Sequence, residues 1–304
     1  MTRREFMEVS IATGVTAAAS SPLSAAAPST RRAFKLAYAP HLGMFRNHAG
    51  DDPVAQLEFM AAEGFTAFED NAMAGRPIPE QERLADAMER LGIRMGVFVV
   101  NMSTAWGPTL ASGDPASRDR FLAECRAAVE VASRVRATWM TVVPGTLVPS
   151  LQMDYQNANV IDALKRGAEI FEPHNLVMVL EPLNHWRDHA GLFLTTTPQA
   201  YMLCRAVASP SCKILFDAYH QQISEGNLIP NLDRAWSEIA YIQVGDNPGR
   251  AEPTTGEINY RNVFRHLHRK AFKGIIGMEH GNSRPGKEGE RRVIDAYAAC
   301  DDFD

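Results

Sequence analysis

The sequence predicts an α/β protein built as a single (β/α)₈ TIM barrel. Short apolar segments alternate with helical patterns eight times along the chain. This series fills roughly 250 residues, the usual size of such a barrel. No predicted strand is followed by a G-x-G-x-x-G or phosphate-binding loop, which disfavours the alternative, an open doubly wound sheet.

The predicted strands are short, nearly continuously apolar and rich in Val, Ile, Met and Phe. Such composition is typical of parallel strands that are buried on both faces. In chain order they are Phe34–Tyr38, Ala67–Glu69, Met95–Val100, Trp139–Val143, Val177–Glu181, Ile214–Asp217, Tyr241–Val244 and Ile275–Glu279.

Between the strands, apolar residues recur at helical spacing. The first of these helices has a cap and a first-turn proline in Asp52-Pro53, as helix starts often do. The helical patterns run over Val54–Ala61, Leu84–Leu91, Phe121–Ala132, Val160–Phe171, Ala200–Val207, Trp236–Ile239, Val263–Leu267 and Ile294–Tyr297. Because no linker or repeat interrupts the series, we expect one catalytic domain over residues 31–304.

Residues 1–30 resemble a twin-arginine export signal. Arg3 and Arg4 precede a mildly apolar stretch, Val9–Ala19, and small residues then lead to an A-x-A cleavage site near Ala27. The alternative is a disordered cytoplasmic tail. The apolar stretch is too short and too rich in Ala, Ser and Thr for a stable membrane span. We therefore expect an exported, periplasmic protein without membrane association once the signal is removed.

The composition describes an ordinary globular protein, with 45% hydrophobic and 22% charged residues. A net charge of -5 argues against a nucleic-acid binder, which usually presents a basic face. The four cysteines show no metal-binding spacing and are predicted to be buried, small apolar residues.

Polar residues end four consecutive predicted strands. They are Glu181, Asp217, Gln243 and Glu279. Because the carboxyl ends of barrel strands meet at one rim, we expect these side chains to converge. Their oxygens would be costly to bury alone, and a hard cation such as Mg²⁺ or Mn²⁺ would neutralise them. The alternative is that each is a buried polar residue paired with a neighbour.

Further polar residues follow the same strands and are candidates for substrate binding. His220 lies three residues after the third-last strand ends, Asn184 follows the strand before it, and Arg250 lies in the loop after the seventh strand. Glu69 ends the second strand and either lines the pocket or caps a loop.

Two glutamates beside one cation indicate proton transfer. A metal that holds a carbonyl and its neighbouring hydroxyl acidifies the C–H between them by stabilising the enediolate. Glu181 and Glu279 can then remove and return the proton, at the adjacent carbon or at the same one. The expected reaction is isomerisation or epimerisation of a small hydroxy-carbonyl compound.

The segments around these residues resemble the xylose-isomerase-like barrels of the sugar-phosphate isomerase/epimerase superfamily. The segments are Leu180–Asn184, Phe216–His220, Ile242–Val244, Gly277–His280, Asp246–Arg250 and Gly256–Tyr260. The last two resemble the hydroxypyruvate isomerase branch in particular. That resemblance implies conversion of hydroxypyruvate to 2-hydroxy-3-oxopropanoate. It also implies proton transfer by Glu181 and Glu279, and Mg²⁺ or Mn²⁺ bound by Glu181, Asp217, Gln243 and Glu279.

Three other functions remain open from the sequence. A ketose or keto-sugar 3-epimerase would use the same site, although those enzymes usually have His where this chain has Gln243. A metal-dependent phosphodiesterase on the same fold would need many more His ligands. A non-catalytic exported sugar-binding barrel would keep the pocket without turnover. The expected partner is a small-molecule substrate, and barrels of this kind often form homo-oligomers.

Overall fold

The computed structural model describes residues 32–107 and 109–304. The expected export signal at residues 1–30 lies outside this part of the chain. Among the described residues, no helix combines the length and apolar character that a membrane crossing requires.

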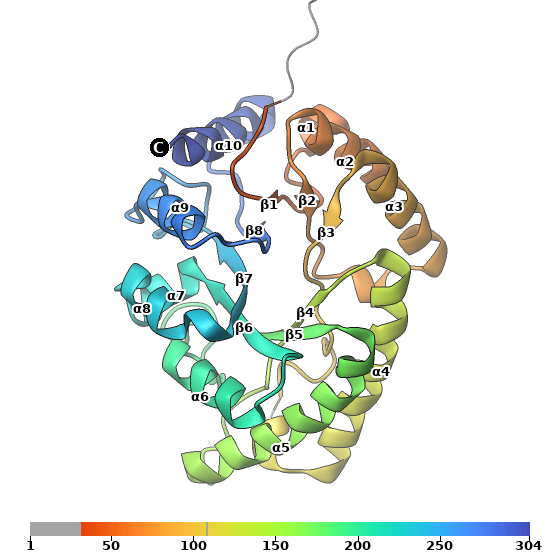
Figure 1. The fold of residues 1–304 in the computed structure, drawn as a ribbon, viewed down its shortest axis with the longest axis vertical. Helices are drawn as coiled ribbons and strands as arrows, with labels where there is room; N and C mark the ends of the chain where they lie inside the picture. The colour runs from red at the N-terminus through yellow and green to blue at the C-terminus, as the bar shows by residue number, and fades with distance from the viewer. Residues whose placement is uncertain (1–31, 108) are drawn as a thin grey trace, which may run out of the picture. The chain divides into compact units, whose positions relative to one another are not determined.

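Within the described residues, eight parallel strands form the wall of a barrel (Figure 1). They are β1 (Tyr38–Ala39), β2 (Ala67–Phe68), β3 (Arg94–Met95), β4 (Trp139–Val142), β5 (Val177–Leu180), β6 (Cys212–Asp217), β7 (Ile239–Val244) and β8 (Ile276–Met278). Six pair in the order β1-β8-β7-β6-β5-β4, and β2 pairs with β3. Parallel bridges His41–Glu69 and Val99–Thr141 join the two sheets into a ring. The predicted (β/α)₈ barrel is confirmed.

Helices surround the strands (Figure 1). They are α1 (Arg46–Ala49), α2 (Pro53–Ala62), α3 (Ile78–Leu91), α4 (Pro115–Val135), α5 (Met153–Phe171), α6 (Thr197–Val207), α7 (Ala218–Ser224), α8 (Leu228–Ala235), α9 (Tyr260–Arg269) and α10 (Gly286–Asp301). The Asp52 cap is confirmed, because its side chain accepts a hydrogen bond from Ala55 N.

The prediction of a helix at Trp236–Ile239 is wrong in detail. The helix there is α8, which ends at Ala235, and a 3₁₀ turn at Trp236–Glu238 leads directly into β7. Trp236 of this turn and Ile239, which begins β7, both pack against the core, so their spacing resembles that of a helix. The four cysteines are buried, as predicted, and the structure shows that they are free.

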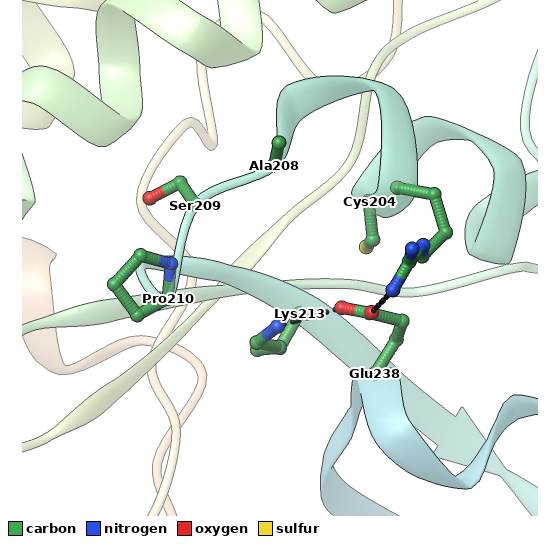
Figure 2. A pocket seen from close by; sticks show the side chains of 7 residues that line it. Cys204, Ala208, Ser209, Pro210, Lys213 and Glu238 are labelled. Atoms are coloured by element: carbon green, nitrogen blue, oxygen red, sulfur yellow. Dashed lines mark hydrogen bonds and ion pairs between the residues drawn. The ribbon is translucent and has the colours of Figure 1, made fainter.

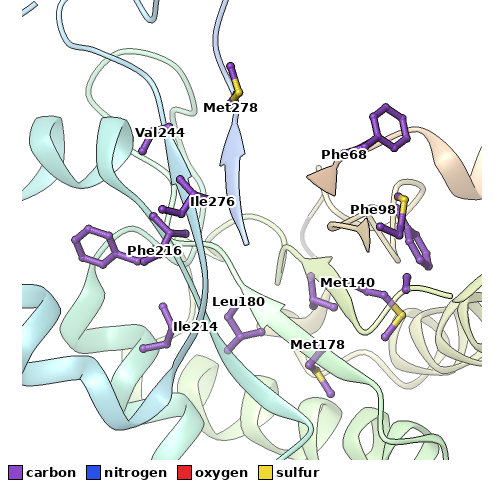
Figure 3. Close-up of a cluster of buried hydrophobic side chains, with 14 of the residues drawn as sticks. Phe68, Phe98, Met140, Met178, Leu180, Ile214, Phe216, Val244, Ile276 and Met278 are labelled. Atoms are coloured by element: carbon purple, nitrogen blue, oxygen red, sulfur yellow. The ribbon is translucent and has the colours of Figure 1, made fainter. Parts of the chain in front are cut away.

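The side chains of each strand alternate between two apolar layers. Met178, Leu180, Ile214 and Phe216 belong to the cluster between the strands and the helices (Figure 3). The residues between them in sequence, Val179 and Leu215, pack instead with Tyr241 in a separate cluster inside the ring. Because alternate residues of a strand face opposite sides, the residues that follow at the strand ends also point inward. Those residues are Glu69, Glu181, Asp217, Gln243 and Glu279.

A buried carboxylate on α10 connects this helix to α1 through hydrogen bonds. Glu290 of α10 is fully buried and accepts hydrogen bonds from Asn47 and His48 of α1, through both backbone N–H groups and both side chains. Burial alone would raise the pKa of Glu290, but these hydrogen bonds outweigh it and hold the pKa below its usual value.

We expect Glu290→Gln to lower the free energy of unfolding by about 2 kcal/mol at neutral pH, because hydrogen bonds to a charged group contribute roughly 1.5–3 kcal/mol each. The pKa of Glu290 is lower in the folded protein than in the unfolded chain. Its full contribution to the free energy of unfolding is therefore present above the usual glutamate pKa. That contribution is lost as the pH falls through the lowered value. Urea unfolding at neutral and acidic pH measures both effects. Glu288→Gln, at an exposed residue on the same helix, is the control; equal stability of the two variants would contradict this role.

Candidate active site

The four residues predicted as metal ligands meet at the carboxyl ends of neighbouring strands. Asp217 pairs in register with Gln243 across β6 and β7. Glu181 and Glu279 directly follow β5 and β8. One ligand atom each from Glu181, Asp217, Glu279 and His220 lies within 4.8 Å of the others. Strands that are far apart in sequence therefore bring these groups into one cluster.

Three oxygens of this cluster are buried without a hydrogen-bond partner among the described residues. They are Glu181 Oε1, Asp217 Oδ2 and Gln243 Oε1. The three residues are at most 6% exposed, so solvent does not compensate these oxygens. Buried oxygens of this kind nearly always have a partner. Three carboxylates and one amide oxygen fit a hard divalent cation, which prefers oxygen ligands.

The carboxylates oppose one another's ionisation. Burial, followed by the charges of Glu279 and Asp217, raises the pKa of Glu181 well above its usual value. Burial also raises the pKa values of Asp217 and Glu279, and the Arg250 guanidinium partly offsets the effect at both. Arg250 Nη2 lies 2.6 Å from Glu279 Oε2 and 3.7 Å from Asp217 Oδ2. The site is therefore short of positive charge.

His220 lies beside the carboxylates with its Nε2 toward them. This atom is 3.9 Å from Glu181 Oε1 and 3.7 Å from Asp217 Oδ2. Burial, with the nearby Arg250 charge, lowers the pKa of His220 to about 3, so the ring is neutral at pH 7.

The hydrogen bonds of Asn184 assign the tautomer of His220. Asn184 Oδ1 accepts from the backbone N–H groups of Arg187 and Asp188, so its Nδ2 donates, to Asp188 and to His220 Nδ1 at 2.7 Å. The Asn184 backbone N–H also points at Nδ1. Arg250 Nη2, which can only donate, lies 3.2 Å from Nε2, so donors face both ring nitrogens, and the contact of Asn184 Nδ2 with Nδ1 is the shorter one. His220 Nδ1 therefore accepts, and Nε2 carries the hydrogen.

Asp188 and Tyr219 belong to the same hydrogen-bond network as Asn184, but neither was identified from the sequence. Asp188 accepts hydrogen bonds from Asn184 Nδ2 and from the Tyr219 hydroxyl, each at 2.9 Å. The Arg250 guanidinium also lies over the Tyr219 ring, 4.9 Å from the ring centroid. In the sequence, the only indication of a role for Tyr219 is its position between Asp217 and His220. Asp188 lies in an irregular loop, where no periodicity points to it.

Glu69 lies on the opposite wall of the barrel, 2% exposed. Its carboxylate accepts hydrogen bonds from the Tyr241 hydroxyl at 2.9 Å and from Gln243 Nε2 at 3.3 Å. Asn71, two residues further, donates to Glu279 Oε1 at 3.0 Å. All eight residues predicted for the site are thus brought to one end of the barrel.

A pocket elsewhere in the molecule does not compete with this site. Figure 2 shows it near the start of β6, whereas Asp217 ends that strand. Its volume is about 380 Å³. The charges that line it are already paired, since Glu238 binds both Lys213 at 2.6 Å and Arg205 at 3.4 Å. Its charged side chains therefore neutralise one another.

Proteins of similar sequence include two isomerases, and a solved structure shares the fold. Hydroxypyruvate isomerase of Escherichia coli is 30% identical over 183 residues, covering 60% of this chain and 70% of that protein. A 2-oxo-tetronate isomerase of Cupriavidus necator is 28% identical, covering 78% of this chain and 89% of that protein. A crystal structure of AP endonuclease, family 2, from Brucella melitensis superimposes with a TM-score of 0.73 at 21% identity, covering 84% and 96% of the two chains, and shows the fold.

A family model described as xylose isomerase-like TIM barrel matches residues 57–300. This range includes seven of the eight strands and every predicted site residue. The chain therefore belongs to the xylose isomerase-like TIM barrel family, and its relatives indicate an isomerase.

Proposed function

We propose that this protein is a metal-assisted isomerase of a small hydroxy-carbonyl acid, with hydroxypyruvate as its substrate and 2-hydroxy-3-oxopropanoate as its product. The observation that carries the proposal is the set of three unpartnered, buried oxygens on Glu181, Asp217 and Gln243. The activity of the relatives supports the same reaction.

The cation would be held by Glu181, Asp217, Gln243 and Glu279. We propose Mg²⁺ or Mn²⁺, because all four donors are oxygens and both ions favour such ligands. When bound, the ion supplies positive charge that polarises the substrate carbonyl and acidifies the neighbouring C–H.

Glu181 and Glu279 transfer the proton. The reaction takes a proton from the hydroxymethyl carbon of hydroxypyruvate and places one on the former carbonyl carbon, while the hydroxyl proton moves between the two oxygens. One carboxylate acts as base and the other, in its acid form, returns the proton. Burial and neighbouring carboxylates raise the pKa of both glutamates, and the bound cation would oppose this shift by stabilising their ionised forms.

His220, Arg250 and Asn184 complete the proposed substrate site. His220 Nε2–H donates a hydrogen bond to a substrate oxygen, and Asn184 holds the ring in the tautomer that permits it. Arg250, whose guanidinium is partly exposed, pairs with the substrate carboxylate. Glu69 contacts this site through its hydrogen bonds with Tyr241 and Gln243.

An epimerase is the second candidate, because the same two carboxylates could return the proton to the carbon that lost it. The substrate would then be a ketose or a keto-sugar. The 2-oxo-tetronate isomerase relative also makes a four-carbon keto acid a reasonable second substrate. An exported binding protein without turnover is the remaining alternative.

Proton NMR in D₂O tests the reaction class. With Mn²⁺ or Mg²⁺, we expect deuterium to enter hydroxypyruvate and the aldehyde isomer to appear. Chelation should stop both, because the carboxylates alone cannot stabilise the charge that develops. Exchange that persists after chelation would contradict metal assistance. Exchange of a ketose without isomerisation would favour the epimerase, and no exchange with any hydroxy-carbonyl compound would favour the binding protein.

Glu181→Gln and Glu279→Gln should each reduce the exchange rate by about 10³-fold or more, since each removes a proton-transfer group. Both variants keep the size of the side chain, so the barrel should remain folded by circular dichroism. Glu58→Gln, on the exposed side of α2, should behave as wild type. Activity within a few-fold of wild type in either active-site variant would exclude the two-glutamate mechanism.

Arg250→Met should raise KM for hydroxypyruvate about tenfold or more, because a charge-assisted hydrogen bond is worth roughly 1.5–3 kcal/mol. Arg250→Lys should recover part of the loss by restoring the charge. Steady-state kinetics measure the effect. An unchanged KM in Arg250→Met would show that Arg250 only balances the charge of the neighbouring acids.

A further inference from the structure

We propose that Glu69 is a positioning residue that fixes the Gln243 amide with its oxygen toward the cation. This inference rests on the proposed function, because it takes Gln243 as a metal ligand. Glu69 would then act on the metal site through Gln243, without contacting the substrate.

An amide ligand has an orientation problem that a carboxylate does not have. Gln243 Oε1 and Nε2 are nearly equal in size, so packing does not distinguish them. Only the oxygen can bind a cation. If the amide were reversed, its N–H groups would point at the cation site and repel the ion.

As a carboxylate, Glu69 removes this ambiguity because it offers only acceptors. Burial and the charges of Glu279 and Asp217 raise the pKa of Glu69, whereas the hydrogen bonds from Tyr241 and Gln243 favour its ionised form. Its Oε1 and Oε2 lie 3.3 and 3.4 Å from Gln243 Nε2. The reversed amide would place its oxygen against the carboxylate of Glu69. Because Nε2 must face Glu69, Oε1 faces the opposite way, and it is the buried oxygen without a partner.

Glu69 is itself held in position. The Tyr241 hydroxyl donates to its Oε2 at 2.9 Å, and Tyr241 lies two residues before Gln243 on β7, so both point into the barrel. The backbone N–H of Glu69 donates to Pro40 O. Gly277 of β8 supplies the space, since a Cβ there would overlap the Glu69 carboxylate.

Burial keeps bulk water away from the contact between Glu69 and Gln243. Glu69 is 2% and Gln243 1% exposed, so water from the bulk does not replace the hydrogen bond.

Mn²⁺ binding without substrate tests the inference, by electron paramagnetic resonance of the free ion. We expect Glu69→Met to weaken Mn²⁺ binding about tenfold or more, the usual effect of removing a group that orients a ligand. In a Gln243→Ala background, where no amide remains to be oriented, the same substitution should have little effect. Circular dichroism checks that each variant is folded, and Glu69→Ala replaces Glu69→Met in the same cycle if the latter does not fold.

A carboxylate at position 243 provides the rescue. Its two oxygens are equivalent and need no orientation, and the double variant Glu69→Met/Gln243→Glu keeps the total charge of the site. We expect this variant to recover most of the Mn²⁺ affinity that Glu69→Met loses.

Each contrary outcome has a distinct meaning. If Glu69→Met weakens binding equally with Gln243 or Ala at position 243, Glu69 acts only through its charge, and the inference is wrong. Unchanged Mn²⁺ affinity in Glu69→Met also overturns it. If Gln243→Ala itself leaves Mn²⁺ affinity unchanged, Gln243 is not a ligand, and the proposed ligand set fails together with the inference.

Discussion

Buried negative charge at one end of the barrel interior is the constraint on which the rest of the site depends. Glu181, Asp217 and Glu279 lie within reach of a single ion, and burial raises the pKa of each. Removing such groups from water is costly unless they are paired. Arg250 supplies one positive charge, and the proposed cation supplies the remainder.

The loop that presents Arg250 is itself organised by a buried acid. Asp246 is fully buried, and its carboxylate accepts hydrogen bonds from the backbone N–H groups of Asn247, Thr255, Gly256 and Ile258. These bonds fold the segment after β7 back on itself. The position of Arg250 is therefore set by the backbone of its loop as well as by its contact with the carboxylates.

Much of this arrangement is encoded locally and could be predicted from the sequence. The apolar strands predict the barrel. The polar residues at their ends predict which rim carries the site, because alternation along a strand determines which side chains point inward. The pairing of Glu69 with Gln243 was not predictable, since 174 residues separate them and only the closed ring brings them together. Helix α7 was also missed, because it follows β6 without a loop and begins at the Asp217 side chain.

The central claim is that four side-chain oxygens hold one divalent cation. Anomalous X-ray diffraction from crystals soaked in Mn²⁺ tests it most directly. The account predicts one strong anomalous peak bounded by Glu181, Asp217, Gln243 and Glu279, with His220 outside the coordination shell. A peak coordinated by His220 in place of Gln243, or no peak at the ends of these strands, would contradict it.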